Sequence, residues 1–200
     1  GYTFNPVEVK ADDEKPAMNV EYHSKQDIVD YYNKHPFDGD MDTKYKEEPD
    51  VFAPYNLGSL TQKTIDNAQN MVNVVRYVAG LSGMTVEDAS LSKSAQAAAL
   101  ANAANGELSH YPRRPRDMSD NMYNLAQEGA SSSNIAMTSG RMTLPMSIRM
   151  YLSDADSGNR SRVGHRRWIL YPTLYKIGFG QVEGYTATRV IGGERNYSAK

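Results

Sequence analysis

The chain has 200 residues, of which 40% are hydrophobic, and a formal net charge of -2, which suits one domain around a single core better than a two-domain enzyme. It has no cysteine, which excludes disulfides, thiol nucleophiles and thiolate metal sites and leaves histidine and carboxylates as metal ligands. No apolar run approaches the about 18 residues of a membrane-spanning helix, and no basic segment followed by an apolar one marks a secretory signal at the start. We therefore expect a soluble chain with no membrane span, from which any export signal has been removed.

Charge is distributed unevenly along the chain. Residues 1–60 hold 13 acidic and 6 basic side chains, a balance of -7, whereas residues 101–200 hold 8 acidic and 13 basic ones, a balance of +5. The basic half either attracts anions or docks the acidic half, and its charge is too low to favour nucleic-acid binding.

Residues 1–58 are rich in Asp, Glu, Lys, Tyr and Pro and show no sustained periodicity. We interpret them as an irregular acidic N-terminal arm, in which Asp27 to Tyr32 form at most one or two helical turns before His35 and Pro36 end them. The arm carries too many aromatic residues for a pure linker, so we expect at least Val51 to Tyr55 to pack on the domain.

Residues 59–200 are expected to form the folded domain, which begins with two helices. Ser59 and Gln62 have capping-box spacing, and apolar residues then recur at steps of three and four until Gly80. A second helix is predicted from Asp88 to Asn105, where the many alanines imply close contact with a neighbouring element.

The rest of the chain changes from helical to strand periodicity. We predict a shorter helix capped by Ser119, a loop over residues 131–140, and a helix over residues 146–152 after Pro145. Alternating apolar residues around the tight turn at Glu183 and Gly184 then predict a terminal hairpin. An isolated hairpin is marginal in water, so we expect it to pack on the helices in a layered α/β arrangement.

Two histidines of the folded half, His110 and His165, carry the candidate chemistry. If they converge with Glu128, the group could bind a divalent cation such as zinc or serve acid–base chemistry near neutral pH. The alternative is that each histidine ends a helix and hydrogen-bonds nearby carbonyls. Four arginines that flank His165 either line an anion site or form a solvated face: Arg160, Arg162, Arg166 and Arg167.

Several segments occur together in an order that is typical of one known family. They are, in chain order, Arg76 to Leu81, Leu91 to Ala99, Leu108 to His110, Gly164 to Pro172, and Ile177 to Gly180. This order resembles a bacterial CAP domain, the superfamily of cysteine-rich secretory proteins, antigen 5 and pathogenesis-related 1. The similarity runs from about residue 59 to residue 191, and it implies a three-layer α-β-α sandwich with an open cleft lined by two histidines and two acids.

The resemblance assigns the cleft residues one by one. His110 matches the first cleft histidine, and His165 matches the histidine of the family's Gly-His motif. Glu128 matches the acid of the Gly-Glu-Asn motif, although different residues flank it here. The second acid is replaced by Asp154 or, as a weaker match, by Asp156. Arg166 and Tyr151 are secondary candidates for the same cleft.

Three functions are open at this point. The resemblance favours a secreted or surface-displayed module whose cleft binds a small molecule, a lipid, a glycan, a peptide or another cell-surface polymer, without catalysis. The second interpretation is a metal-dependent hydrolase in which His110 and His165 hold zinc or another divalent cation and Glu128 or Asp154 activates water. The third is a structural or adhesive surface protein in which the cleft has no role. The sequence does not define the oligomeric state.

Overall fold

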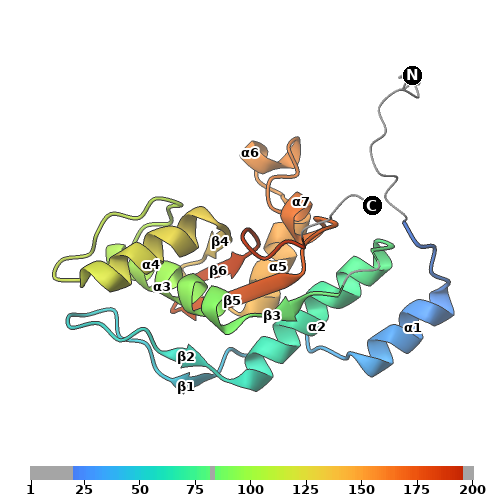
Figure 1. Ribbon diagram of the computed structural model, residues 1–200, viewed down its shortest axis with the longest axis horizontal. Coiled ribbons are helices and arrows are strands. Elements are labelled where there is room, and N and C mark those ends of the chain that lie inside the picture. Colours follow the sequence, from blue (N-terminus) through green and yellow to red (C-terminus); the bar gives the residue numbers. More distant parts are fainter. Residues whose placement is uncertain (1–19, 82–83, 196–200) are drawn as a thin grey trace.

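The computed structural model describes residues 20–81 and 84–195, and the expectations for residues 1–19 and 196–200 lie outside this range. The helices are α1 Lys25–Lys34, α2 Gln62–Val78, α3 Ala89–Asn105, α4 Asp120–Ser131, α5 Leu144–Ser153, α6 Ser157–Arg160 and α7 Arg166–Ile169. The strands are β1 Tyr45–Glu47, β2 Ser59–Leu60, β3 Val86–Glu87, β4 Ser133–Met137, β5 Lys176–Val182 and β6 Tyr185–Arg189. Figure 1 shows how these elements are arranged.

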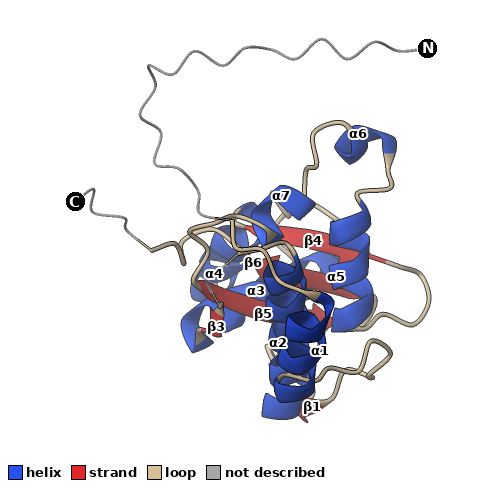
Figure 2. Cartoon of the chain, turned by 90° about the vertical axis from the view of Figure 1, so that its right-hand side faces the viewer, coloured by secondary structure: helices blue, strands red, loops and turns tan. Residues whose placement is uncertain are grey.

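A four-stranded sheet in the order β3-β5-β6-β4 forms the middle layer of the domain. β5 and β6 make the predicted antiparallel hairpin, β4 continues it antiparallel to β6, and β3 pairs parallel to β5 at the other edge. In Figure 2 β4 is the uppermost of these strands, followed by β6 and β5. β1 and β2 form a separate two-stranded ribbon.

Helices cover both faces of the sheet. On one face, Val72 of α2 and Leu144 and Ile148 of α5 pack around Phe179 of β5. On the other face, alanines of α3 and α4 pack around Ile135 of β4 and Ala187 of β6. The expected three-layer α-β-α sandwich is therefore confirmed.

α3 lies unusually close to β5 because two glycines of that strand have no side chain. A Cβ atom at Gly178 would collide with the backbone of Leu91, and one at Gly180 would collide with the backbone of Gln96. The helix predicted from Asp88 to Asn105 is present as α3; the Asp88 side chain caps its start, and Gly106 ends it in the left-handed conformation. The alanines of α3 thus give the close contact that their number implied.

A buried arginine connects α2 to the segment that carries α7. The Arg76 guanidinium is fully buried and donates to the carbonyl oxygens of Ile169, Tyr171 and Leu174. Burial lowers the pKa of Arg76 to about 10, so the side chain remains charged at neutral pH. This contact fixes the chain that follows His165 against the body of the domain.

The segment before the domain is more regular than we predicted. Residues 25–34 form the helix α1, in which the Ser24 side chain accepts from Asp27 N while the Asp27 carboxylate accepts from Ser24 N at 2.8 Å. Tyr31 stacks on Tyr77 of α2 at a centroid distance of 4.0 Å. The helical turns predicted for Asp27 to Tyr32 are present and end at His35, and the helix is longer than expected because a capping box and an aromatic partner stabilise it.

Part of the predicted stretch packs on the domain, while Phe52, Ala53 and Pro54 are exposed. Val51, Tyr55 and Leu57 are partly buried against a cluster formed by α3, α4 and Val182. The Tyr55 hydroxyl donates to Arg116 O at 2.5 Å.

Two further expectations are corrected. α2 begins after Thr61, whose side chain accepts from Thr64 N, while Ser59 belongs to β2. Residues 133–137, expected to be a loop, form the mostly buried strand β4, because β6 provides a pairing partner about 50 residues further along the chain.

The close approach of α3 to β5 gives a stability prediction. Gly180→Ala should lower the free energy of unfolding by about 1–3 kcal/mol, because the added methyl group must displace the helix backbone. Gly140→Ala is the matched control, since the nearest atom to a Cβ there is 4.0 Å away, and it should change stability by less than about 0.5 kcal/mol. Urea unfolding measures both, and equal effects of the two substitutions would contradict the packing described.

Candidate functional site

A pocket of about 470 Å³ lies where β4, the end of α5 and the loop after α3 meet. Both His110 and His165 line it, so the structure brings together the two histidines that the sequence singled out. Its apolar wall includes Leu108, Ile135 and Met150. The pocket therefore combines imidazole groups with hydrophobic surface.

His165 is held in place by a buried carboxylate. Asp154 caps the C-terminus of α5 in the left-handed conformation with φ 43°, and its side chain is fully buried. It accepts hydrogen bonds from His165 Nδ1 at 2.8 Å, from His165 N at 3.0 Å and from Arg166 N at 3.0 Å. Asp154 consequently supports the pocket from behind His165 and does not line it.

The surroundings of Asp154 keep it ionised. Burial alone raises the pKa of a carboxyl group, but the backbone N–H groups of Arg166 and His165 and the imidazole of His165 outweigh this effect. The pKa of Asp154 therefore lies below its ordinary value. A carboxylate can only accept, so His165 Nδ1 is the donor and carries a hydrogen.

His110 has the same arrangement with a different acceptor. Its Nδ1 lies 2.8 Å from the carbonyl oxygen of Ala130 at the end of α4. A carbonyl oxygen can only accept, so this nitrogen also carries a hydrogen. Among the described residues, neither His110 Nε2 nor His165 Nε2 has a hydrogen-bond partner, and these two atoms are the ring nitrogens that can act on a ligand.

The structure does not bring Glu128 into the pocket. Its carboxylate pairs with Arg189 Nη2 at 2.9 Å, and the side chain is 61% exposed, whereas that of Arg189 is 7% exposed. Arg189 also donates to Ser94 Oγ at 2.6 Å, which fixes the guanidinium between α3 and α4. The ion pair with this buried cation fixes the direction of the Glu128 carboxylate.

The secondary candidates have separate roles. Tyr151 lines the pocket, and its buried hydroxyl lies 3.2 Å from Thr186 Oγ1. Burial raises the pKa of the Tyr151 phenol, so the hydroxyl stays protonated. Asp156 also lines the pocket, but it accepts from Asn159 N and Asn159 Nδ2, and these bonds lower its pKa. Arg166 is outside the pocket lining and contributes its backbone N–H to Asp154.

A comparison with protein-family models identifies the fold that carries this pocket. The model described as "CAP: Cysteine-rich secretory protein family" matches residues 69–192, which is more than half of the chain. The chain belongs to this family. The match extends from the middle of α2 to just beyond β6, so it includes both histidines and Asp154. Neither a search of curated proteins nor one of solved structures finds a match.

The CAP domain does not present a complete ligand set for a metal ion. Within residues 20–81 and 84–195, no group of three or more His, Asp or Glu side chains is placed to hold one. The two free Nε2 atoms are fewer than the three protein ligands of a catalytic zinc ion or the four of a structural one. The residues present therefore do not fit zinc, and we assign no chemical step to a metal.

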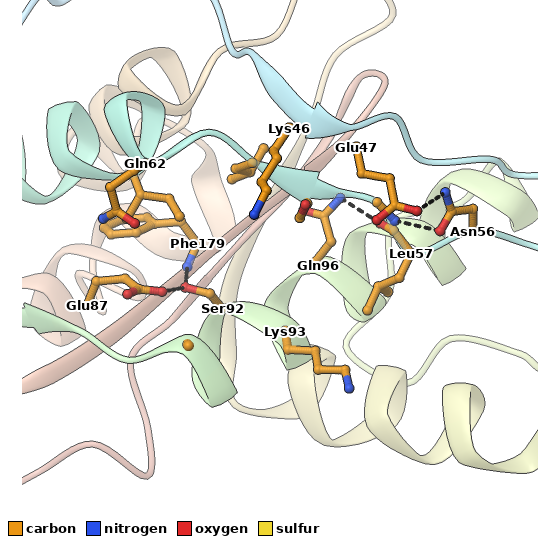
Figure 3. A pocket seen from close by; sticks show the side chains of 15 residues that line it. Lys46, Glu47, Asn56, Leu57, Gln62, Glu87, Ser92, Lys93, Gln96 and Phe179 are labelled. Atoms are coloured by element: carbon orange, nitrogen blue, oxygen red, sulfur yellow. Dashed lines mark hydrogen bonds between the residues drawn. The ribbon is translucent and has the colours of Figure 1, made fainter.

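A second, larger pocket lies on another part of the CAP domain. It has a volume of about 610 Å³ and lies between the β1-β2 ribbon and the N-terminal part of α3. Figure 3 shows Lys46 reaching in between Phe179 and Gln96. The Gln96 amide donates to Leu57 O and Gln181 O, and the Glu87 carboxylate accepts from Ser92 Oγ. Since the Gln96 amide and the Glu87 carboxylate bond within the protein, we assign no chemistry to this pocket.

The part of the site that sequence analysis missed is the strand beneath it. Ile135, Ala136 and Met137 of β4 line the His pocket, yet residues 131–140 were expected to be a loop. The only signal was a four-residue stretch, Asn134 to Met137, that is too short to show periodicity. Across residues 20–81 and 84–195, none of the helices combines the length and the hydropathy that a membrane span requires.

The buried carboxylate gives a pH-dependent prediction. Asp154→Asn should lower the free energy of unfolding by about 2–3 kcal/mol near pH 7, because the amide cannot accept all the bonds of a charged group. Asn tolerates the left-handed conformation, so the substitution tests the charge. The native pKa is lowered, so this stabilisation is complete above the unfolded pKa of about 3.9 and is lost as the pH falls through the native pKa.

Urea unfolding of both proteins at about pH 7 and about pH 2 measures this difference. Asp66→Asn, at an exposed position on α2, is the control and should change stability by less than about 0.5 kcal/mol at either pH. An Asp154→Asn effect that is equally large at both pH values would be inconsistent with the assigned role.

Proposed function

We propose that this CAP-domain protein is a secreted or surface-displayed binding module whose His pocket takes up a lipid, glycan or peptide without reacting with it. The observation that carries the proposal is the fixing of both imidazoles by internal acceptors. With each Nδ1 bonded to Asp154 or Ala130, His110 and His165 present preorganised Nε2 atoms to a ligand. A neutral imidazole in this form offers Nε2 as an acceptor for a ligand hydroxyl or amide group.

The carboxylates near the pocket support binding over hydrolysis. A hydrolase of the kind considered above needs a carboxylate that is free to take a proton from water. Asp154 is occupied by three donors, Asp156 by Asn159, and Glu128 by Arg189. Each acid therefore has a structural partner in the described chain, which favours a pocket used for recognition.

The apolar wall favours a ligand with a hydrophobic part. Leu108, Ile135, Met137 and Met150 line the pocket together with the histidines. Met137 and Met150 remain 38% exposed, which leaves flexible thioether side chains to adapt to a ligand.

The proposal is tested by placing a charge on this wall. A panel of fatty acids, sterols, oligosaccharides and capped peptides is added while the thermal midpoint is followed, and at least one class should raise it with increasing concentration. Met150→Glu should then weaken binding of that class at least tenfold, because the carboxylate loses hydration against the ligand. Met84→Glu is the matched control, since Met84 is 41% exposed and does not line the pocket.

Equal binding by the Met150→Glu and Met84→Glu variants would place the ligand elsewhere and refute the proposal. Chemical turnover of any panel member by the unmodified protein would instead support the hydrolase interpretation.

A further inference from the structure

The outer edge of the sheet at β4 has no neighbouring strand. β4 is the last strand in the order β3-β5-β6-β4, and within the described residues it pairs with β6 alone. One row of its backbone N–H and C=O groups therefore points away from β6.

The register determines which residues form this outer row. Ser132 O accepts from Val190 N, and Thr138 N donates to Gly184 O, so the residues that bracket β4 are both bonded towards β6. The register pairs Ile135 with Ala187 and Met137 with Tyr185. Alternate residues of an antiparallel strand bond to the same neighbour, so Asn134 and Ala136 also bond towards β6. The backbone groups of Ile135 and Met137 consequently point outwards.

These outward groups have no partner inside the protein. In the part of the chain that the structure describes, no hydrogen bond involves the N–H or C=O groups of Ile135 or Met137. The opposite edge of the sheet is different, because side chains of α2 cover it. Asn73 accepts from Thr85 N and Gln69 accepts from Glu87 N. The protein thus covers the β3 edge with side chains of α2, whereas at the β4 edge the outward backbone groups of Ile135, which is 6% exposed, and of Met137, which is 38% exposed, have no partner in the described chain.

The unpaired part of the β4 edge coincides with the His pocket. Ile135, Ala136 and Met137 line the pocket together with His110 and His165. Three strand residues extend about 10 Å, which matches three residues of a second extended chain. Unpaired backbone groups in a pocket are unfavourable against a hydrocarbon ligand, which offers them no donors or acceptors.

We propose that the ligand of the His pocket is an extended polypeptide segment that pairs with Ile135 and Met137 and adds a fifth strand to the sheet. This inference rests on the proposed function, and it selects peptide from the three ligand classes. A peptide supplies alternating N–H and C=O groups at the spacing of the strand, which neither a lipid tail nor a glycan does.

Positive charge beside the pocket indicates that the bound polypeptide segment carries negative charge. Arg160 and Arg162 are exposed on and just after α6, next to Asn159, which lines the pocket. Figure 1 shows the α6 segment projecting from the body of the domain. We expect acidic side chains to flank the part of the partner that pairs with β4.

Amide hydrogen exchange tests the unpaired part of the β4 edge directly. In the free protein, the amides of Ile135 and Met137 should exchange at least tenfold faster than those of Asn134 and Ala136. The best binder from a library of doubly capped hexapeptides should slow exchange at Ile135 and Met137 at least tenfold and leave Asn134 and Ala136 unchanged. Failure of every library member to protect these two amides would overturn the inference.

A proline substitution removes one outward donor without breaking the β4-β6 ladder. Met137→Pro should weaken the selected hexapeptide at least tenfold relative to Met137→Ala, since both lose the thioether and only proline lacks the N–H group. Equal affinities of the two variants would show that the Met137 N–H makes no contact with the peptide and would contradict strand pairing at this position.

Peptide variants keep the test independent of how well the proline protein folds. Replacing single amide hydrogens of the hexapeptide by methyl groups should abolish binding at alternate positions only, those whose N–H faces β4. If a lipid or oligosaccharide binds in a manner sensitive to Met150→Glu and leaves Ile135 and Met137 unprotected, the strand-pairing inference fails while the binding module stands. If no probe is sensitive to Met150→Glu, the proposed function itself fails.

Discussion

The contact between α3 and β5 is the constraint on which the arrangement of the pocket depends. Glycines at positions 178 and 180 let the helix backbone lie directly on the strand. On the other side of α3, Gly129 of α4 meets Ser94 in the same way. This close packing of β5, α3 and α4 sets the position of the loop after α3, which carries His110. It also sets the position of Ala130 O, which binds the His110 imidazole.

The second histidine comes from the opposite layer of the sandwich. Asp154 ends α5, which covers the other face of the sheet, and it orients His165 through a buried carboxylate. The two imidazoles therefore approach β4 from opposite faces of the sheet, and they meet at its outer edge. A pocket formed in this way combines fixed ring nitrogens, a hydrophobic wall and unpaired backbone groups of a strand.

Local signals were sufficient to predict the parts of the fold that depend on neighbouring residues. Asp88 and Gly106 mark the ends of α3, Ser119 caps α4, and the turn at Glu183 and Gly184 defines the hairpin. β4 could not be predicted, because its five residues become a strand only through pairing with β6. α1 was underestimated, since its stacking partner Tyr77 lies 46 positions further along the chain than Tyr31.

The difference between local signals and long-range contacts also explains which residues of the candidate site the sequence could identify. The histidines were found because they match the motifs of a CAP domain, and Asp154 because it takes the place of the family's second acid; both histidines line one pocket, and Asp154 bonds to His165. Glu128 matched a motif as well, but its position is decided by Arg189, which is 61 residues away in sequence and buried beside it. Motif spacing does not contain that pairing, and composition gives no indication that the edge of β4 is left unpaired beneath the histidines.

The central claim is that internal acceptors hold both imidazoles with Nδ1 protonated and Nε2 directed to a ligand. Long-range proton–nitrogen correlation NMR of the free protein at a pH where the rings are neutral reads this directly. We predict that His110 and His165 both show a protonated Nδ1 and an unprotonated Nε2. The opposite tautomer at either ring would contradict the account, because the hydrogen bonds to Ala130 O and to the Asp154 carboxylate could then not form.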